Sequence, residues 1–211
     1  MRHMSACGGV LLVFLALAGG CSNPSKIRAE AGIRPIYDTS TGRLKELTLD
    51  SNRNGRIDTW TQMDGARPIE TRIDRNEDGR LDRWEYYDTS AQLVKVGFSR
   101  KDDGRPDGWA YSGSDGRIQR IEISSVSDEN TIDRWEHYDG SGLVSAEEDT
   151  NADGVVDKWE TYRSGALSSA AFDEDRDGRP DRRMAYDAGA LVSIETGFNA
   201  AGKFTKRVDA R

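Results

Sequence analysis

Cysteine and histidine are nearly absent from this chain of 211 residues, which contains two of each. Cys7 and Cys21 both lie near the amino end, so no disulfide framework can hold the fold together. His3 lies there too, which leaves His137 as the one imidazole in the rest of the sequence. No serine has a plausible base, and no cysteine follows Cys21. The sequence therefore predicts a protein that is not an enzyme.

The chain is also poor in apolar residues, at 36%, and rich in charged residues, at 32%, with a net charge of −7. This composition is too polar for one thick core and favours a thin, elongated array whose units contact only their neighbours. The acidic residues gather in short segments, and no basic patch with interleaved aromatic residues is visible. The charge pattern favours binding of cations and excludes nucleic acid as a partner.

One pattern recurs along the chain. Asp149–Trp159 reads D-x-N-x-D-G-x-x-D-x-W, with oxygen-bearing side chains at positions 1, 3, 5 and 9 and glycine at position 6. Further copies begin at Asp50, Asp74 and Asp173, and two eroded copies run from Ser99 to Trp109 and from Ser125 to Trp135. The turn residues, spaced by 24, 25, 26, 24 and 24 positions, are Gly55, Gly79, Gly104, Asn130, Gly154 and Gly178. A fixed period of this size is typical of a repeat architecture.

The segments between the acidic loops alternate like strands. Residues 44–49, 93–98 and 118–123 show apolar alternation, and residues 84–87, 135–138 and 159–162 form second, aromatic strands. We predict an all-β fold of tandem β-hairpin repeats of about 24–26 residues, which form an elongated antiparallel sheet or spiral. Residues 36–211 would hold six hairpin repeats and a terminal capping half-repeat, whose loop Gly197–Gly202 has no carboxylates.

The acidic loops are candidate calcium sites, because hard cations take six to eight oxygen ligands and glycine permits the positive φ of a sharp turn. The predicted ligands are Asp50, Asn52, Asn54 and Asp58; Asp74, Asn76, Asp78 and Asp82; Asp149, Asn151, Asp153 and Asp157; and Asp173, Asp175, Asp177 and Asp181. The number of carboxylates predicts the strongest binding for the loop that begins at Asp173 and the weakest for the loop that begins at Asp50. Lys101 should leave its copy empty, and the copy at Ser125 offers serines at positions 1 and 3 beside Glu129 and Asp133, so we expect four sites in six copies.

Two simpler interpretations stand beside this one. Asp, Asn and Gly also build turns through hydrogen bonds from side chain to backbone, although acids at positions 1, 5 and 9 would repel one another in an empty loop. The tryptophans recur at the repeat period, which predicts a core ladder or, alternatively, a carbohydrate-binding strip; they are Trp60, Trp84, Trp109, Trp135 and Trp159.

The amino end has the features of a targeting segment. Arg2 and His3 precede an apolar run at residues 10–18 that is too short to span a bilayer as a mature helix. The sequence L-A-G-G-C that ends at Cys21 resembles the lipobox of bacterial lipoproteins. The resemblance implies that residues 1–20 are a signal peptide, that Cys21 is lipidated and that Ser22 directs sorting to the outer membrane; ordinary cleavage after Gly20 is the alternative. Residues 21–35 would be a tether.

The loops and strands resemble known families. Asp74–Glu85 and Asp149–Glu160 resemble EF-hand loops, which implies that Glu85 and Glu160 close their sites at position 12. Aspartate at position 9 resembles instead the D-x-D-x-D-G-x-x-D calcium loops of integrin-type β-propellers, which lie between strands. Residues 37–44 are similar to the Y-D-x-x-G-R-L core of YD repeats, which form long spiralling sheets.

Together these features look like bacterial envelope lipoproteins with tandem acidic-loop β repeats. We therefore expect a non-catalytic, calcium-binding scaffold or adhesion protein, lipid-anchored to the bacterial outer membrane on its periplasmic or cell-surface side. Its partners would be the membrane and an envelope protein or glycan. The alternative is a glycan- or peptide-binding module that uses exposed aromatic residues or a free sheet edge.

Overall fold

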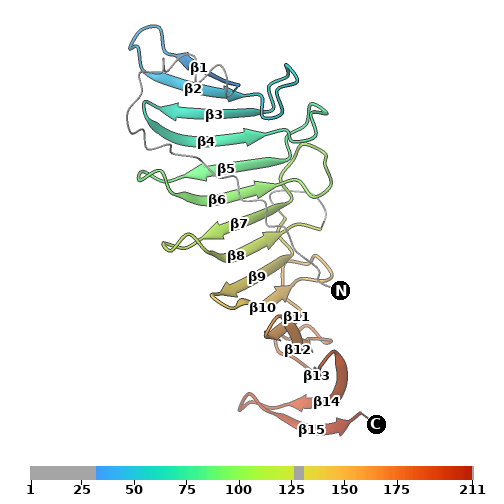
Figure 1. Cartoon of the computed structure of the whole chain (residues 1–211). Coiled ribbons are helices and arrows are strands. Elements are labelled where there is room, and N and C mark those ends of the chain that lie inside the picture. Colours follow the sequence, from blue (N-terminus) through green and yellow to red (C-terminus); the bar gives the residue numbers. More distant parts are fainter. Residues whose placement is uncertain (1–31, 126–130, 211) are drawn as a thin grey trace.

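The structure is a computed structural model that describes residues 32–125 and 131–210. These residues form one antiparallel sheet of 15 strands, in which each strand pairs with its neighbours in sequence (Figure 1). The strands are β1 (Ile33–Tyr37), β2 (Leu44–Leu49), β3 (Thr59–Asp64), β4 (Arg67–Ile73), β5 (Arg83–Tyr87), β6 (Leu93–Phe98), β7 (Gly108–Ser112), β8 (Ile118–Ile123), β9 (Arg134–Asp139), β10 (Gly142–Glu148), β11 (Lys158–Arg163), β12 (Ala166–Phe172), β13 (Arg182–Asp187), β14 (Ala190–Phe198) and β15 (Phe204–Asp209).

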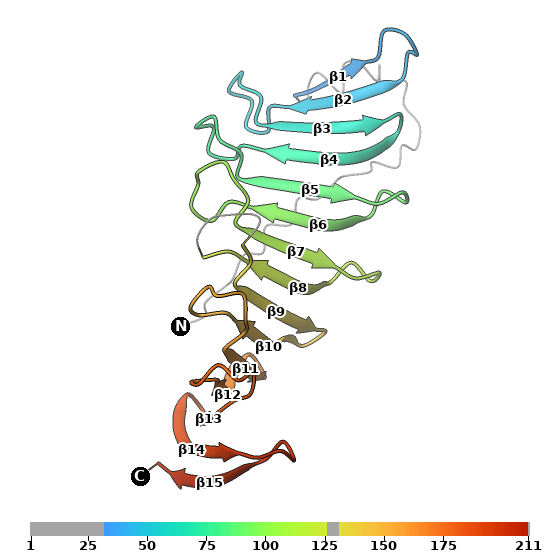
Figure 2. The same cartoon turned by 180° about the vertical axis from the view of Figure 1, so that it is seen from behind.

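The predicted all-β fold is confirmed, and the sheet is open. β1 and β15 lie at opposite ends of the array, and the sheet twists along its length (Figures 1 and 2). The strands predicted at residues 44–49, 93–98 and 118–123 have the observed bounds. No helix in the described part of the chain is long and apolar enough to cross a membrane.

Two predicted boundaries are wrong. β1 begins at Ile33, inside the stretch assigned to the tether, because residues 33–37 pair with β2. Pro35 fits there because proline is tolerated in an edge strand, where a missing N–H costs no ladder bond. At the other end, Gly197 and Phe198 belong to β14, so the last connection is residues 199–203. Residues 1–31, with Cys21, lie outside the described part.

The meander separates two kinds of connection. Long acidic loops follow β2, β4, β6, β8, β10 and β12, and short turns follow the odd-numbered strands. Consecutive connections of a meander alternate between the two lateral edges of the sheet, so all the long loops share one edge. Figure 2 shows them along the left side of the upper sheet, with the short turns on the right. The repeat thus places equivalent loops side by side.

The tryptophans form a row on one face but do not stack directly on one another. Gly97 pairs with Trp84 on one side and with Trp109 on the other, so one strand separates each tryptophan from the next. That separation is about 10 Å, or two strand spacings. Trp84 and Trp109 are nevertheless only 8% exposed. Lys95 covers the second ring, with its Nζ 3.7 Å from the centroid.

The opposite face carries apolar residues such as Leu47 and Ile73 together with the Arg83–Glu85 ion pair near β2–β5, and a larger charged network further along. Arg134 on β9 contacts Glu136, Glu148 and Glu160 at 2.9–3.1 Å, and Lys158 contacts the last two at 2.9 Å. These residues lie on consecutive strands, so their ion pairs join β9, β10 and β11. The network holds together a single-layer sheet that has few fully buried apolar side chains among its described residues.

Candidate metal-binding loops

Six acidic loops leave one edge of the sheet. They are loop 1 (50–58), loop 2 (74–82), loop 3 (99–107), loop 4 (124–133), loop 5 (149–157) and loop 6 (173–181). Loop 4 is described only at residues 124–125 and 131–133. Backbone bonds link their bases: the N–H of Asp74 donates to the carbonyl of Asp58, and the N–H of Asp173 donates to that of Asp157. The sheet ladder therefore continues into the loops and fixes each loop against the next.

The first and sixth positions of a loop bond to each other. The carboxylate of Asp74 accepts the N–H of Gly79 at 2.9 Å, and that of Asp173 accepts the N–H of Gly178 at 2.7 Å. The glycines have φ of 92° and 82°, as the sequence predicts. Loops 1 and 5 repeat this bond. The first aspartate thus lies beneath the loop and is almost completely buried in each of these four loops.

The other predicted ligands also have hydrogen-bond roles. In loop 6, Asp175 accepts the N–H of Asp177, Asp177 accepts that of Arg179, and Asp181 accepts those of Glu174 and Asp175. The turn-building interpretation therefore accounts for one oxygen of each of these three acids and for both oxygens of Asp173, which accept the N–H groups of Arg176 and Gly178. A carboxylate has a second oxygen and further lone pairs, so these bonds leave room for a cation.

Three carboxylates of loop 6 come together. Oxygens of Asp173, Asp175 and Asp177 all lie within 4.8 Å of one another, and this group could hold a metal ion. In the described part of the chain it is the one group of three or more acids, histidines or cysteines that meets this distance. It belongs to the loop with the most carboxylates, which the sequence ranks first.

The charge of this cluster affects Asp175. The N–H of Asp177 lowers the pKa of Asp175, but burial and the charges of Asp181, Asp177 and Asp173 together raise it above its ordinary value. Loops 2 and 3 show the same effect at Asp102. Its pKa is raised by a hydrogen bond shared with Asp82, by burial and by the charges of Asp78 and Asp82. A bound cation would relieve both repulsions.

Loop 4 differs from its predicted register. The N–H of Ser124 donates to the carbonyl of Asp107, the same bond that Asp74 and Asp149 make at the first position of their loops. Ser124, not Ser125, therefore holds position 1, and the loop has one extra residue. The position-9 acid keeps its role, because Asp133 accepts the N–H of Ser125. One extra residue between two strands is invisible to a sequence pattern whose register is set by Asn130.

Glu85 and Glu160 do not join the loop carboxylates. Glu85, on β5, accepts bonds from the Arg83 guanidinium and the Tyr87 hydroxyl, one on each oxygen. Glu160, on β11, bonds to Tyr162 and pairs with Lys158 and Arg134. The position-12 role implied by the EF-hand resemblance is therefore corrected: a strand follows position 9 here, and it places position 12 on the sheet face. The integrin-type pattern, which ends on the aspartate at position 9, describes the geometry better.

Position 4 is a feature that the sequence analysis missed. It has positive φ without being glycine, at 62° in Arg53, 57° in Glu77, 55° in Asp102, 58° in Ala152 and 66° in Arg176. No residue type marks it in the sequence. Its side chain contacts the preceding loop: Glu77 accepts bonds from Asn54 at 2.6 and 2.8 Å, and Arg176 lies 3.9 Å from Asp153.

Loop 3 carries Lys101 where the others have a ligand. Its Nζ donates to the carbonyl of Ser125 in loop 4 at 2.6 Å. The lysine therefore reaches across to the next loop. Lys101 still places a positive charge at position 3 in place of an oxygen, and the expectation that this loop holds no ion of its own stays a prediction.

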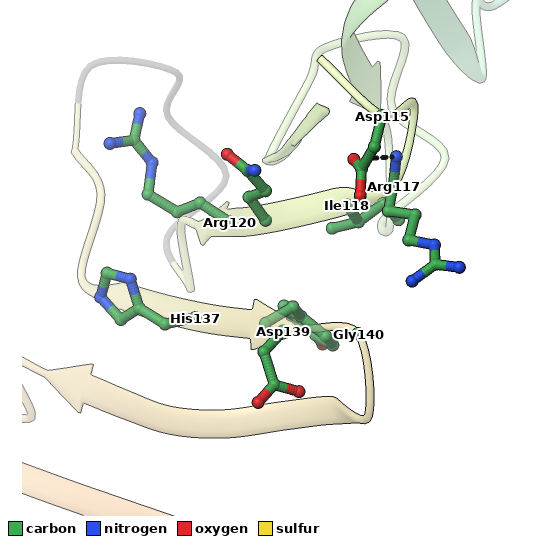
Figure 3. Close-up of a pocket in the computed structure, with 9 residues that line it drawn as sticks. Asp115, Arg117, Ile118, Arg120, His137, Asp139 and Gly140 are labelled. Carbon is green, nitrogen blue, oxygen red and sulfur yellow. Dashed lines mark hydrogen bonds between the residues drawn. The ribbon is translucent and has the colours of Figure 1, made fainter. Parts of the chain in front are cut away.

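A shallow hollow of about 530 Å³ lies on the opposite edge, between β8 and β9. It contains His137, together with Arg120 and Asp139. Figure 3 shows these labelled side chains spreading away from the strands instead of converging on one point.

No family model matches this sequence, and no curated protein does. Solved structures with some similarity include a mutant of TarM from S. aureus, at 14% identity and a TM-score of 0.37, over 46% of this chain and 19% of that one. Another is accessory secretory protein 1, 2 and 3 from Streptococcus pneumoniae, at 13% identity and a TM-score of 0.38, over 59% of this chain and 22% of that one. A third is TcdB2-TccC3, at 11% identity and a TM-score of 0.21, over 84% of this chain and 13% of that one. The chain thus spans about a fifth or less of these structures, and likenesses at such TM-scores carry no argument about function.

Proposed function

We propose that this protein is a non-catalytic, calcium-binding repeat protein of the bacterial cell envelope, anchored by a lipid at Cys21, with a scaffold or adhesion role. The observation that carries the proposal is the group Asp173, Asp175 and Asp177, whose oxygens lie within 4.8 Å of one another. Loops 1, 2 and 5 share its bond between positions 1 and 6 and its positive φ at positions 4 and 6. This likeness supports four sites along one edge.

Calcium fits these loops better than softer metals. The predicted ligands are carboxylate and amide oxygens, which suit hard cations, whereas zinc and copper favour histidine and cysteine. The loops also contain many ligand oxygens on a short, curled backbone, which matches the large and flexible coordination shell of calcium. Magnesium demands a stricter octahedral geometry and is the natural comparison ion.

Calcium would stabilise the array. Extracellular-type modules bind it with dissociation constants of about 0.1–1 mM. At about 1 mM calcium and a dissociation constant near 0.1 mM, one site adds about 1.4 kcal/mol. Four independent sites would add roughly 5–6 kcal/mol, which is comparable to the stability of a whole domain. For a single-layer sheet with little core, such a contribution would decide whether the edge stays ordered.

The lipid anchor and the envelope location rest on the L-A-G-G-C sequence at residues 17–21. More than one acyl chain on Cys21 would give stable membrane attachment. Mass spectrometry of the amino-terminal peptide tests this part directly. The expected result is an acylated Cys21; an unmodified cysteine would remove the anchor while leaving the calcium proposal intact.

The alternative is a glycan- or peptide-binding module. Low exposure of Trp84 and Trp109, at 8% each, weakens a carbohydrate strip built from the whole tryptophan row. A free sheet edge fits this alternative better, because β15 pairs only with β14 and its Val208 is 70% exposed. A peptide could add there as a further strand.

Thermal unfolding of the purified chain, followed by circular dichroism, tests the calcium proposal. We expect the melting temperature in about 1 mM calcium to exceed that in excess chelator by many degrees. Magnesium should reproduce little of the rise, and Asp177→Ala or Asp153→Ala should reduce it. Asp115→Ala, in a short turn on the opposite edge, is the matched control. Identical melts in calcium and chelator would mean that the acidic loops are only turns.

A further inference from the structure

The acidic loops are not independent units, because position 4 of one loop contacts the preceding one. Neighbouring loops are two strands apart, or about 10 Å. Position 4 has positive φ, and the side chains of Glu77, Asp102 and Arg176 at this position contact the preceding loop. Glu77 of loop 2 shows how complete the contact is, since its side chain is only 10% exposed and accepts bonds from Asn54 of loop 1.

The same contact joins loop 3 to loop 2. The carboxylate of Asp102 accepts the side-chain amide of Asn76 at 2.9 Å. Arg80 of loop 2 donates to the backbone carbonyl of Asp102 at 3.0 Å and holds that residue in place. Asn76 is itself a predicted ligand, at position 3 of loop 2. Asp102 therefore lies against the side of loop 2 where its oxygen-bearing side chains are.

An independent observation in loop 2 points to a missing partner. Asp74 is 6% exposed, and its Oδ1 is buried without a hydrogen bond, while its Oδ2 accepts the N–H of Gly79. In loops 1 and 5 the corresponding Oδ1 accepts the N–H at position 5, from Asn54 and Asp153. The Oδ1 of Asp74 thus lies inside the loop. A buried anionic oxygen is costly unless it is paired, and a cation in the loop would pair it.

We propose that loop 2 binds its calcium ion together with Asp102 of loop 3, so that one ion is held by two adjacent repeats. The oxygen set is Asp74, Asn76, Asp78 and Asp82 from loop 2 and Asp102 from loop 3. This inference rests on the proposed calcium-binding function and adds to it a ligand from the next repeat. Calcium at this position ties neighbouring repeats together at the loop edge.

The inference changes the expected order of affinities. Counting each loop's own carboxylates ranks loop 5 with loop 2. With position 4 of the following loop included, loop 2 gains the carboxylate of Asp102, whereas loop 5 receives the guanidinium of Arg176 near Asp153. A positive charge beside the site opposes a cation. Loop 2 is therefore expected to bind more tightly than loop 5.

Calcium titration of the full chain by NMR tests the proposal, because the position-6 glycine amides report on single loops. In Asp102→Asn we expect affinity measured at Gly79 to fall about tenfold or more, with Gly154 and Gly178 unchanged. Asp115→Asn, with the same charge change on the opposite edge, should leave all three unchanged. Asp102→Glu, which keeps the carboxylate, should recover part of the affinity. A folded spectrum in each variant separates ligand loss from unfolding.

The outcomes separate this inference from the function on which it rests. If Gly79 responds to calcium with the same affinity in Asp102→Asn as in the parent, loop 2 binds alone and the shared site is wrong, while calcium binding stands. If Gly79 is silent while Gly178 responds, the shared site is also wrong. If no glycine amide responds to millimolar calcium in the parent, the calcium proposal itself fails.

Discussion

Substitution of Gly97 by alanine is a sharp test of the tryptophan row. Gly97 on β6 is buried between Trp84 and Trp109, with which it pairs across the two neighbouring strands. A methyl group at this position would lie 2.5 Å from Cζ3 of Trp109 and 3.0 Å from its Cε3. Carbon atoms do not approach so closely, and Lys95 covers the same ring, so the ring cannot move away freely.

The expected effect follows from two opposing contributions. Overpacking a well-packed site costs about 1–3 kcal/mol. Replacing glycine by alanine within a strand by itself raises the free energy of unfolding by about 0.5–1 kcal/mol, because alanine loses less conformational entropy on folding. The net destabilisation of Gly97→Ala should therefore be about 0.5–2 kcal/mol. For a chain of this length we expect the melting temperature to fall by about 1–8 °C.

Thermal and urea unfolding in chelator measure this effect without the contribution of metal. Gly140→Ala is the matched control, because its new methyl group would meet only the mobile end of Arg117, at 3.1 Å. The double variant that also carries Trp109→Leu should lose less stability than the sum of the two single variants, with a coupling energy of about 0.5–3 kcal/mol. If Gly97→Ala is as stable as the parent, or shows no coupling to Trp109→Leu, the packing of Trp109 over Gly97 is refuted.

Three further predictions concern the network and the loops. Burial alone would raise the pKa of Glu160, but bonds from Lys158, Tyr162 and Arg134 hold that pKa below its ordinary value of 4.5. The ionised Glu160 therefore stabilises the fold fully above pH 4.5, and this stabilisation is lost as the pH falls through the lowered pKa. Glu160→Gln should then lower the free energy of unfolding in urea by about 1–3 kcal/mol at pH 7, with a smaller difference at pH 3; an equal difference at both would contradict the assignment. Gly154→Ala should lower the free energy of unfolding, measured in thermal melts, by about 1–2 kcal/mol. The cause is the φ of 89° alone, because the new methyl group would meet nothing within 4 Å. A loss no larger than that of Gly140→Ala would argue against the left-handed turn. Asp149→Ala removes the acceptor of the N–H groups of Asp153 and Gly154, and should lower stability by about 1–3 kcal/mol even in chelator; an effect seen only with calcium would mean that this acid has no turn-building role.

The prediction of loop positions succeeded where a short segment fixes its own conformation. The sixth position needs positive φ, and glycine marks it in the sequence at Gly79 and Gly178. The fourth position needs positive φ too, but residues as different as Glu77, Ala152 and Arg176 adopt it there. Their conformation is imposed by the bonds of the surrounding loop, and no residue type records it. The insertion that moves position 1 to Ser124 was missed for the same reason.

The repeat, the strands and the oxygen-rich composition of the loops can be recognised in the amino-acid sequence alone. Its period, its apolar alternation and its D-x-N-x-D-G spacing are local properties, so they can be found without knowledge of the fold. Contacts between residues of different repeats, by contrast, depend on how the strands pair in the folded sheet. The meander sets equivalent loops about 10 Å apart, and that distance brings Asp102 to Asn76 and Glu77 to Asn54. It also places Glu85 and Glu160 in ion pairs on the sheet face. Those contacts depend on strand pairing and on the direction of each side chain, which a linear pattern does not specify.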